Sequence, residues 1–311
     1  MPKINIIANN NGVGLTRDIS IIANVLKDYS VDILPIYDNN ILNKGADKLK
    51  ADLNIFLELF NPNFFSLAPK NVVIPNPDWL PIQLVHFFQR IDLFLTKTKH
   101  ASAIFDRYKS KNKFIGFTSY DRFLPNVSKD KNQCLHLAGK SIQKSTDLVI
   151  GMWEKHPELP LLIVIQDRSK KKIRKETKNI KYIYDRLSDE DLKVYQNSSE
   201  IHVCPSETEG FGHYIMEGLN CKGIVVTTDA PPMNELVTSE RGVLCPHSRT
   251  GIMRLAVSYF VTENSLFESV KKALSLSDDD KTIIGNNARR FYEENDKAFK
   301  DNLSVTIKEI L

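Results

Sequence analysis

Short apolar runs alternate with longer segments of helical pattern in the first part of the chain. The runs have the length of strands, and they lie at residues 4–8, 31–36, 53–57, 72–74, 91–95 and 114–117. The first run leads into a glycine-containing loop at 9–15 and then into a helical pattern at 16–28. Strand, glycine turn and helix in this order are typical of a nucleotide-binding fold. We therefore expect a mostly parallel sheet covered by helices, whereas the apolar stretch 84–88 receives no assignment.

The same alternation restarts after a polar segment at 124–131 that is rich in turn-forming residues. Strands are predicted at 134–138, 161–165, 180–184, 200–204 and 224–227, and helices at 144–154, 189–196 and 213–221. Strands that alternate with helices imply βαβ units. The sequence thus predicts an α/β protein with two Rossmann-like domains, at 1–126 and 127–285. The charged helical tail from 286 to 311 is expected to pack back on the first domain.

Composition changes this picture little. The chain has 311 residues, enough for two domains with full cores, and its apolar fraction of 42% and charged fraction of 26% are those of a globular protein. A net charge of +4 is too small to argue for nucleic acid by itself. The four cysteines lie far apart without metal-ligand spacing, so neither a disulfide framework nor a zinc site is indicated.

No segment has the pattern of a signal peptide or a membrane span. The N-terminus begins directly as a strand, and the longest apolar run, at 161–165, is far below the roughly 18 residues of a span. We expect a cytoplasmic protein whose membrane contact, if any, is peripheral. The basic run at 168–175 favours a solvated loop, with an acidic acceptor or a membrane surface as the alternative. It lacks the interleaved aromatic residues that stack on bases.

The most informative stretch, residues 206–223, carries two carboxylates, Glu209 and Glu217, around the turn Gly210-Phe211-Gly212. The glycines allow the backbone to approach a ligand, and the start of the helix that follows favours an anion. Glu217 lies on the opposite side of this helix from its apolar residues, so we expect it to point into a cleft. A carboxylate can accept hydrogen bonds from two neighbouring hydroxyls of a ribose or a hexose. The competing interpretation is a surface glutamate on an ordinary amphipathic helix.

The string from Glu209 to Glu217 resembles the E-x7-E signature of retaining glycosyltransferases with the GT-B architecture, particularly family 4. Upstream, residues 137–144 resemble the Gly-Arg…Lys segment of that family, with Lys140 in place of the usual arginine. Such a replacement keeps the charge but loses bidentate contact with phosphate. Downstream, 228–237 and 242–246 resemble the segments that follow the next strands. The resemblance implies a GT-B fold, in which the two domains face a central cleft.

The same resemblance assigns roles to individual residues. Lys140 and Lys144 would stabilise the charge that develops on the donor diphosphate, and Glu209 with the backbone of Gly210, Phe211 and Gly212 would meet the donor sugar. Glu217 would bind the ribose. Further donor contacts are expected from Gly12, Gly14 and Arg186. For the two glycines a structural βα turn is the alternative, and for Arg186 a surface role is.

On the acceptor side, Ser119 or Asp121 would stand where the family often has a histidine, with His100 and His213 as other candidates. The implied activity is transfer of a hexose from a nucleotide-diphosphate sugar to a hydroxyl acceptor, with retention through front-face attack. The lysines would supply the positive charge, so no metal and no cofactor besides the donor substrate is required. Two alternatives stay open: a catalytically silent nucleotide- or glycan-binding module, and a transferase acting on a modified nucleic-acid base.

Overall fold

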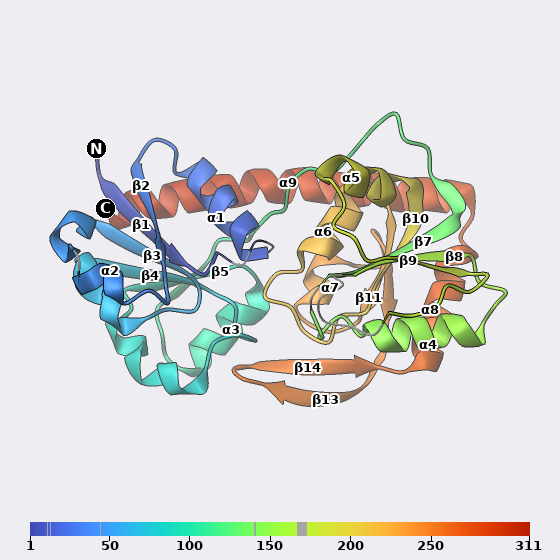
Figure 1. Ribbon diagram of the computed structural model, residues 1–311, viewed down its shortest axis with the longest axis horizontal. Coiled ribbons are helices and arrows are strands. Elements are labelled where there is room, and N and C mark those ends of the chain that lie inside the picture. Colours follow the sequence, from blue (N-terminus) through green and yellow to red (C-terminus); the bar gives the residue numbers. More distant parts are fainter. Residues whose placement is uncertain (11, 13, 44, 140, 167–172) are drawn as a thin grey trace. The chain divides into compact units, whose positions relative to one another are not determined.

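The chain divides into two compact units, each an α/β layer structure with its own parallel sheet (Figure 1). The computed structural model describes residues 1–10, 12, 14–43, 45–139, 141–166 and 173–311. Unit 1 comprises Met1–Ser119, Ile252–Val257 and Asn295–Leu311, and unit 2 comprises Tyr120–Gly251 and Ser258–Glu294. The prediction of two Rossmann-like domains with parallel sheets is confirmed.

Unit 1 is built on a six-stranded parallel sheet in the order β2-β1-β3-β4-β5-β6. Its strands are β1 (Lys3–Ala8), β2 (Ser30–Pro35), β3 (Leu53–Glu58), β4 (Lys70–Pro75), β5 (Leu93–Thr96) and β6 (Asn112–Phe114). Its helices are α1 (Gly14–Val25), α2 (Asn40–Asn43) and α3 (Lys99–Arg107), with 3₁₀ segments η1 (Ala46–Leu49), η2 (Pro62–Leu67) and η3 (Ile82–Arg90). The central strands are buried on both sides, as expected for parallel strands covered by helices. In β3, for example, every residue from Leu53 to Leu57 is buried.

Aromatic rings fill much of the core of unit 1. The ring of Phe88, on η3, lies 4.9 Å from that of Phe94 and 5.6 Å from that of Phe105, and the last two stack at 4.3 Å. The stretch 84–88, which received no assignment from the sequence, therefore belongs to a 3₁₀ segment. This segment places the ring of Phe88 in the core. Such ring pairs contribute about 0.5–1.5 kcal/mol beyond the area that they bury.

Unit 2 has a second six-stranded parallel sheet, in the order β12-β11-β10-β7-β8-β9. Its strands are β7 (Asp130–Gly139), β8 (Leu161–Gln166), β9 (Ile180–Ile183), β10 (Ser199–Cys204), β11 (Ile224–Thr228) and β12 (Val243–Cys245). The helices are α4 (Thr146–Lys155), α5 (Asp189–Ser198), α6 (His213–Asn220), α7 (Met233–Leu236) and α8 (Glu263–Leu274), and a two-stranded sheet of β13 (His247–Met253) and β14 (Ala256–Val261) follows β12. Trp153 of α4 is fully buried in the core, and its indole N–H donates to the carbonyl of Pro160 at 2.9 Å.

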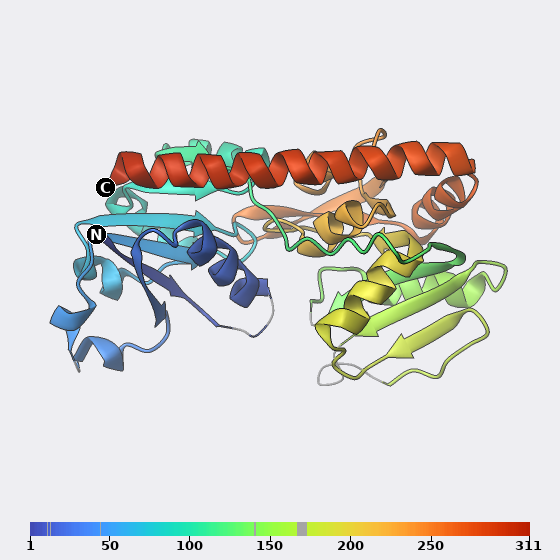
Figure 2. The same ribbon diagram turned by 90° about the horizontal axis from the view of Figure 1, so that it is seen from above.

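The long helix α9 (Asp278–Ile310) is continuous, and its first part belongs to unit 2 while the part from Asn295 belongs to unit 1 (Figure 2). Phe299 packs its ring 4.8 Å from that of Phe117, and Asn295 and Asn302 donate to the carbonyls of Phe117 and Ile115. The tail predicted to begin at 286 is thus part of a longer helix. From Asn295 onward it packs on residues of unit 1, whereas its residues 286–294 belong to unit 2.

Two boundaries differ from the prediction. The division between the units falls at Ser119 and Tyr120, before the predicted position at 126, because the polar segment that follows is bonded into unit 2. Leu124 donates its backbone N–H to the side chain of Asn197, and Lys129 donates to the carbonyl of Ser199. The predicted strand at 114–117 ends at Phe114, since Gly116 adopts a φ of 74° and turns the chain away.

Candidate active site

Unit 2 places its most polar loops where the strand order of its sheet reverses. Strands β8 and β9 follow β7 on one side, whereas β10, β11 and β12 continue from the other side of β7. Ligands of open α/β sheets bind outside the carboxyl ends of the strands at such a switch point. Here those ends are Gly139 of β7 and Cys204 of β10. These strand ends lead into the two segments that resemble the family motifs, the one that contains Lys144 and the one from Glu209 to Glu217.

The loop between Cys204 and α6 requires glycine where it enters the helix. Gly212 is the N-cap of α6 with a φ of 99°, a conformation that L side chains rarely adopt. A Cβ atom here would also lie 3.2 Å from Ile215 Cδ1 and 3.3 Å from Leu236 Cδ1. No side chain caps α6, so the N–H groups of its first turn face the loop. This helix start is suited to an anion.

Lys144 lies beside this helix. Its ammonium donates to the carbonyl of Leu137 at 2.8 Å and lies 3.9 Å from the centroid of the Tyr214 ring. The hydroxyl of Tyr214 is in turn 2.5 Å from Ser206 Oγ, which donates to Glu209 Oε1 at 2.6 Å. Burial raises the pKa of Glu209, while the nearby Lys144 charge and the Ser206 hydrogen bond oppose that rise. A cation, a carboxylate and a helix start are therefore brought together within unit 2.

Glu217 differs from its expected environment. Its side chain is only 1% exposed, because α6 is buried on nearly all sides, including the side that the spacing left for a cleft. Glu217 Oε2 accepts a hydrogen bond of 2.7 Å from Gln196 Nε2, and Gln196 Oε1 accepts one of 2.8 Å from Arg122 Nε. Arg122, itself buried, also pairs with Asp189 Oδ1 at 2.5 Å. Glu217 is thus part of a buried polar chain.

The other residues that were predicted to contact the donor do not form one cluster with Lys144 and Glu209 in the described part of the chain. Lys140 lies outside the described residues, as do residues 168–172 of the basic run. Phe211 is buried, and its ring meets that of His213 edge-on at 5.5 Å. Arg186 is exposed and makes no hydrogen bond or ion pair with any described residue. Gly12 and Gly14 belong to unit 1, where Gly12 has a φ of 71° and Gly14 begins α1.

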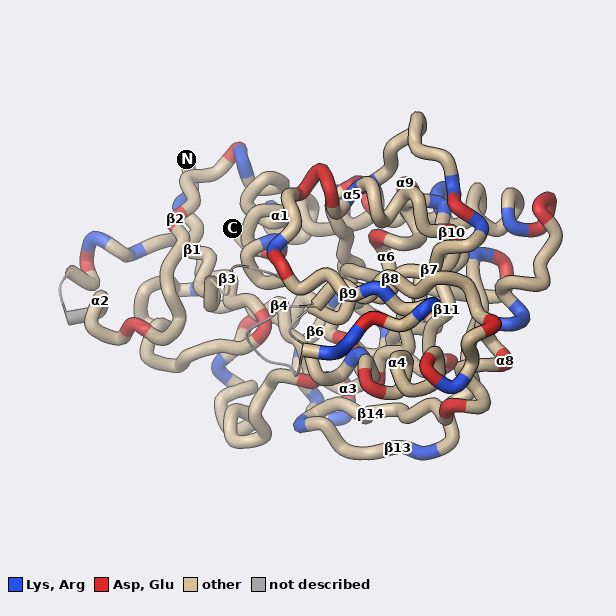
Figure 3. Tube along the Cα trace, turned by 45° about the vertical axis from the view of Figure 1, so that its right-hand side comes forward, with Lys and Arg blue, Asp and Glu red and all other residues tan. Residues whose placement is uncertain are grey.

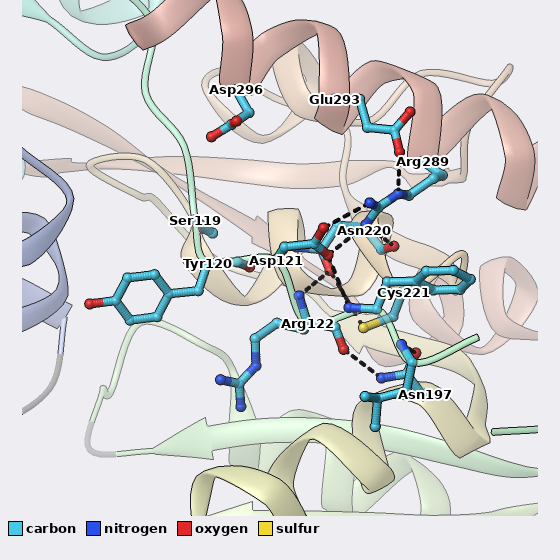
Figure 4. Close-up of polar contacts among 12 residues, drawn as sticks. Ser119, Tyr120, Asp121, Arg122, Asn197, Asn220, Cys221, Arg289, Glu293 and Asp296 are labelled. Atoms are coloured by element: carbon cyan, nitrogen blue, oxygen red, sulfur yellow. Dashed lines mark hydrogen bonds and ion pairs between the residues drawn. The ribbon is translucent and has the colours of Figure 1, made fainter. Parts of the chain in front are cut away.

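The two acceptor-side candidates have separate surroundings. Ser119 is buried at the end of a unit 1 segment. Asp121 is held in unit 2 by a bidentate ion pair, in which Arg289 donates to its two carboxylate oxygens at 2.6 and 2.7 Å (Figure 4). The backbone N–H of Phe123 adds a third hydrogen bond to the same carboxylate. Although burial alone would raise the pKa of Asp121, the Arg289 hydrogen bonds and charge lower it. Both carboxylate oxygens of Asp121 are thus engaged in joining α9 to the segment that opens unit 2.

Several residues of the site had no assigned role in the sequence. Ser206 and Tyr214 lie inside the motif, and a search for hydroxyls spaced around the two glutamates would have found them. Gln196 and Arg122 carry no such signal, because 74 residues separate the two in the chain. Only the fold brings them to Glu217.

Charged side chains and possible metal ligands complete the description of the surface. Positive and negative side chains are interspersed along the chain (Figure 3). In the described ranges, no group of three or more His, Cys, Asp or Glu residues is arranged to hold a metal ion. None of the described helices is both long and apolar enough to cross a membrane.

Comparison with solved structures identifies the fold as GT-B. Sucrose-phosphate synthase from Thermosynechococcus elongatus matches with a TM-score of 0.72 at 12% identity, over 99% of this chain and 98% of that one. HepE from Anabaena, solved with UDP and glucose, also matches with a TM-score of 0.72 at 12% identity, over 99% and 100% of the two chains. A structure from Escherichia coli, described as trehalose-6-phosphate bound with UDP-2-fluoro glucose, matches with a TM-score of 0.67 at 10% identity, over 99% of this chain and 98% of that one. At these identities the likeness establishes the fold alone.

Sequence comparison adds the family. No curated protein matches the chain. The family model of glycosyl transferases group 1 matches residues 120–290, which is more than half of the chain and covers the switch point, α6 and the Glu209 to Glu217 motif. This chain therefore belongs to the glycosyl transferases group 1 and is a glycosyltransferase.

Proposed function

We propose that this glycosyltransferase moves a hexose from a nucleotide-diphosphate sugar to a hydroxyl acceptor, with retention of the anomeric configuration. The observation that carries the proposal is the cluster of Lys144, Tyr214, Ser206 and Glu209 beside the uncapped start of α6 at the switch point of unit 2. A diphosphate leaving group gains negative charge as the bond to the sugar breaks. A fixed cation and helix-start amides stabilise that charge more than they stabilise the bound donor.

The roles that the family resemblance implies are proposed for the same residues. Lys144, with Lys140, meets the diphosphate, and Glu209 with Gly210, Phe211 and Gly212 meets the transferred sugar. Glu217 binds the ribose of the nucleotide. It makes its side chain available by exchanging the Gln196 hydrogen bond for the sugar hydroxyls. No metal ion is required, since the lysines supply the positive charge.

The reaction conserves atoms without a protein nucleophile. The acceptor oxygen forms a bond to the anomeric carbon on the face from which the diphosphate oxygen leaves. The acceptor proton passes to the departing phosphate, which acts as the base, and the products are the glycoside and a nucleoside diphosphate. Two carboxylates that come from one loop and one helix do not form a glycosidase pair, which flanks the bond that is cut.

The proposal is tested with a panel of UDP-, GDP- and ADP-sugars. UDP-glucose is the first donor to try, because HepE was solved with it. We expect the melting temperature to rise with at least one nucleotide, since a ligand that binds only the folded state stabilises it. We also expect slow hydrolysis of the matching sugar donor, and proton NMR of a transfer product should show the donor's anomeric configuration. Failure of every donor to bind or react would rule out the function, and an inverted product would rule out retention alone.

A further inference from the structure

A chain of four polar side chains lies at the carboxyl edge of the unit 1 sheet. Glu58 is the last residue of β3, Asn76 and Lys97 directly follow the ends of β4 and β5, and Asp18 comes from α1. Lys97 Nζ donates to Asp18 Oδ2 at 2.5 Å and to Asn76 Oδ1 at 3.0 Å. Asn76 Nδ2 donates to Glu58 Oε2 at 3.1 Å. Because β3, β4 and β5 are parallel neighbours, their carboxyl ends meet at one edge (Figure 1).

The inner end of this chain is a buried ion pair. The side chains of Lys97 and Asp18 are 2% and 4% exposed, and the Lys97 ammonium also lies 4.5 Å from the centroid of the Phe117 ring. Such a pair contributes little net stability, because removing both charges from water offsets most of their attraction. It does fix the amide of Asn76, since the carbonyl oxygen of Asn76 must face the ammonium. The Asn76 N–H₂ group is thereby directed at Glu58.

The backbone of Glu58 is strained. Its φ is 71°, in the left-handed region, which costs a non-glycine residue about 1–3 kcal/mol. The hydrogen bond from the backbone N–H of Asn76 to the Glu58 carbonyl, at 3.0 Å, holds this conformation. Glycine would occupy the position without strain, so a glutamate here carries a cost to stability.

One oxygen of this carboxylate is available. Oε2 accepts the hydrogen bond from Asn76, whereas no donor among the described residues contacts Oε1. No lysine or arginine of the described chain forms an ion pair with Glu58 either. The group is half-buried, and burial raises its pKa, an effect that the Asn76 hydrogen bond and the charges of Lys97 and Arg254 oppose. A half-buried carboxylate with a free oxygen is suited to accept hydrogen bonds from hydroxyls.

An exposed aromatic ring lies on the same turn. Trp79 donates its backbone N–H to the carbonyl of Asn76 at 2.9 Å, and its side chain is 40% exposed. Arg254 donates to the carbonyl of Trp79, and its guanidinium carbon lies 5.0 Å from the centroid of the indole. Proteins bind sugars with an aromatic face for the apolar side and a few fixed polar groups for the hydroxyls.

The position in the sheet agrees with a binding site. The strand order β2-β1-β3-β4 reverses between β1 and β3, so the switch point of unit 1 lies at the carboxyl end of β3. This inference rests on the proposed transfer reaction, which requires an acceptor site as well as the donor cluster of unit 2. We infer that Glu58 binds the hydroxyls of a sugar acceptor, with Asn76 as the positioning residue and Trp79 as the apolar platform. Asp121, by contrast, accepts a hydrogen bond from Arg289 at each of its carboxylate oxygens.

Binding of the acceptor is measured first without any donor. Saturation-transfer NMR on the full chain uses methyl α-glucoside, methyl β-galactoside, maltose and lactose as probes. We expect transfer to at least one sugar for the wild-type protein and its loss in Glu58→Gly. Because glycine relieves the positive φ, this variant should melt at the same temperature as the wild type or higher, so a lost signal cannot be attributed to unfolding.

Turnover then separates this inference from the proposed function. With a nucleotide-sugar that the wild type hydrolyses, Glu58→Gly and Glu58→Gln should keep nucleotide affinity and donor hydrolysis within about twofold, while kcat/KM for the sugar acceptor falls about 10- to 100-fold. Asn76→Ala should raise the acceptor KM and leave kcat unchanged. Wild-type acceptor kinetics in both Glu58 variants, or no sugar binding by the wild type, would overturn the acceptor site and leave donor chemistry standing. Loss of nucleotide binding in the wild type would instead overturn the proposed function.

Discussion

At the scale of single residues, candidate functional side chains can be recognised from the sequence more readily than the residues that they contact. Glu209 and Lys144 are recognisable because their spacing from glycines and strand ends is local. Asp121 is paired with Arg289, which lies 168 residues further along the chain, and nothing local announces that pair. Glu58 was missed for a related reason, because a strained φ and an unpaired oxygen leave no trace in the order of residues.

The Asp121 ion pair predicts a dependence of stability on pH. Because the pKa of Asp121 is lowered in the folded state, the pair stabilises unit 2 fully above the ordinary value of 3.8 and is lost as the pH falls through the lowered pKa. We expect Asp121→Asn to reduce the free energy of unfolding by about 1 kcal/mol at pH 7. In urea unfolding this difference from the wild type should shrink toward pH 3. Asp301→Asn, at an exposed position of α9, is the control for removal of one charge, and an effect equal to that of Asp121→Asn would contradict the pairing.

The buried His202 leads us to expect a second and larger effect of pH on the stability of the fold. Burial lowers its pKa to about 3 from an ordinary value of 6.5, with a further lowering by the charge of Lys129. The neutral ring therefore contributes its full stability above pH 6.5, and the contribution is lost as the pH falls from there toward 3. We expect wild-type stability to decline by about 1.4 kcal/mol per pH unit more steeply than that of His202→Gln between pH 6 and 5. Parallel pH profiles of the two proteins would show that His202 is not the group responsible.

At the scale of elements, apolar runs made the buried strands predictable from the sequence. Some elements without such a run were not predicted. Strands β1, β3 and β8 were located to within a residue or two because parallel strands are buried on both sides. The sheet of β13 and β14 was not predicted, since most of β13 is exposed and has no apolar run. Helix α3 also went unassigned, although Thr98 caps it by accepting a hydrogen bond from the N–H of Ala101.

Two glycines provide a matched test of how the elements of unit 2 pack. A Cβ on Gly242 would lie 2.6 Å from the carbonyl oxygen of Val225, in the neighbouring strand β11, so Gly242→Ala should destabilise the protein by about 1–3 kcal/mol. A Cβ on Gly151, within α4, meets nothing within 4 Å, so Gly151→Ala should stabilise it by about 0.5–1 kcal/mol. Thermal unfolding of both variants measures these shifts. If both variants changed the melting temperature in the same direction, the space around each glycine would not be what decides the effect of the added methyl group.

At the scale of the whole molecule, the sequence predicted two parallel-sheet units but not how the chain is shared between them. Unit 1 recruits the end of α9 and residues Ile252–Val257 from far along the chain. A single boundary at residue 126 cannot describe a unit that is built from three separate segments of the chain. Family membership was within reach of the sequence because several motifs stand in the right order, whereas the acceptor region was not, because it depends on three strand ends and one helix meeting in space.

The shared helix gives a test at this scale. Phe299 is fully buried against Phe117, so Phe299→Ala should cost about 3–5 kcal/mol. Since both residues belong to unit 1, hydrogen exchange should accelerate in β1 to β6 more than in β7 to β12. Val305→Ala, at a position of the same helix that is 52% exposed, should leave both units unchanged. Equal acceleration in both sheets would contradict the assignment of this part of α9 to unit 1.

The central claim is that the cluster around Lys144 stabilises a departing nucleoside diphosphate. Its most direct test is the steady-state turnover of a nucleotide-sugar by the wild type and Lys144→Met, with Lys155→Met as the control, because Lys155 is an exposed lysine that pairs with Glu263 away from the motif. We predict that kcat falls about 10²- to 10³-fold in Lys144→Met and stays within about twofold in Lys155→Met. Equal kcat values in all three proteins would contradict the account.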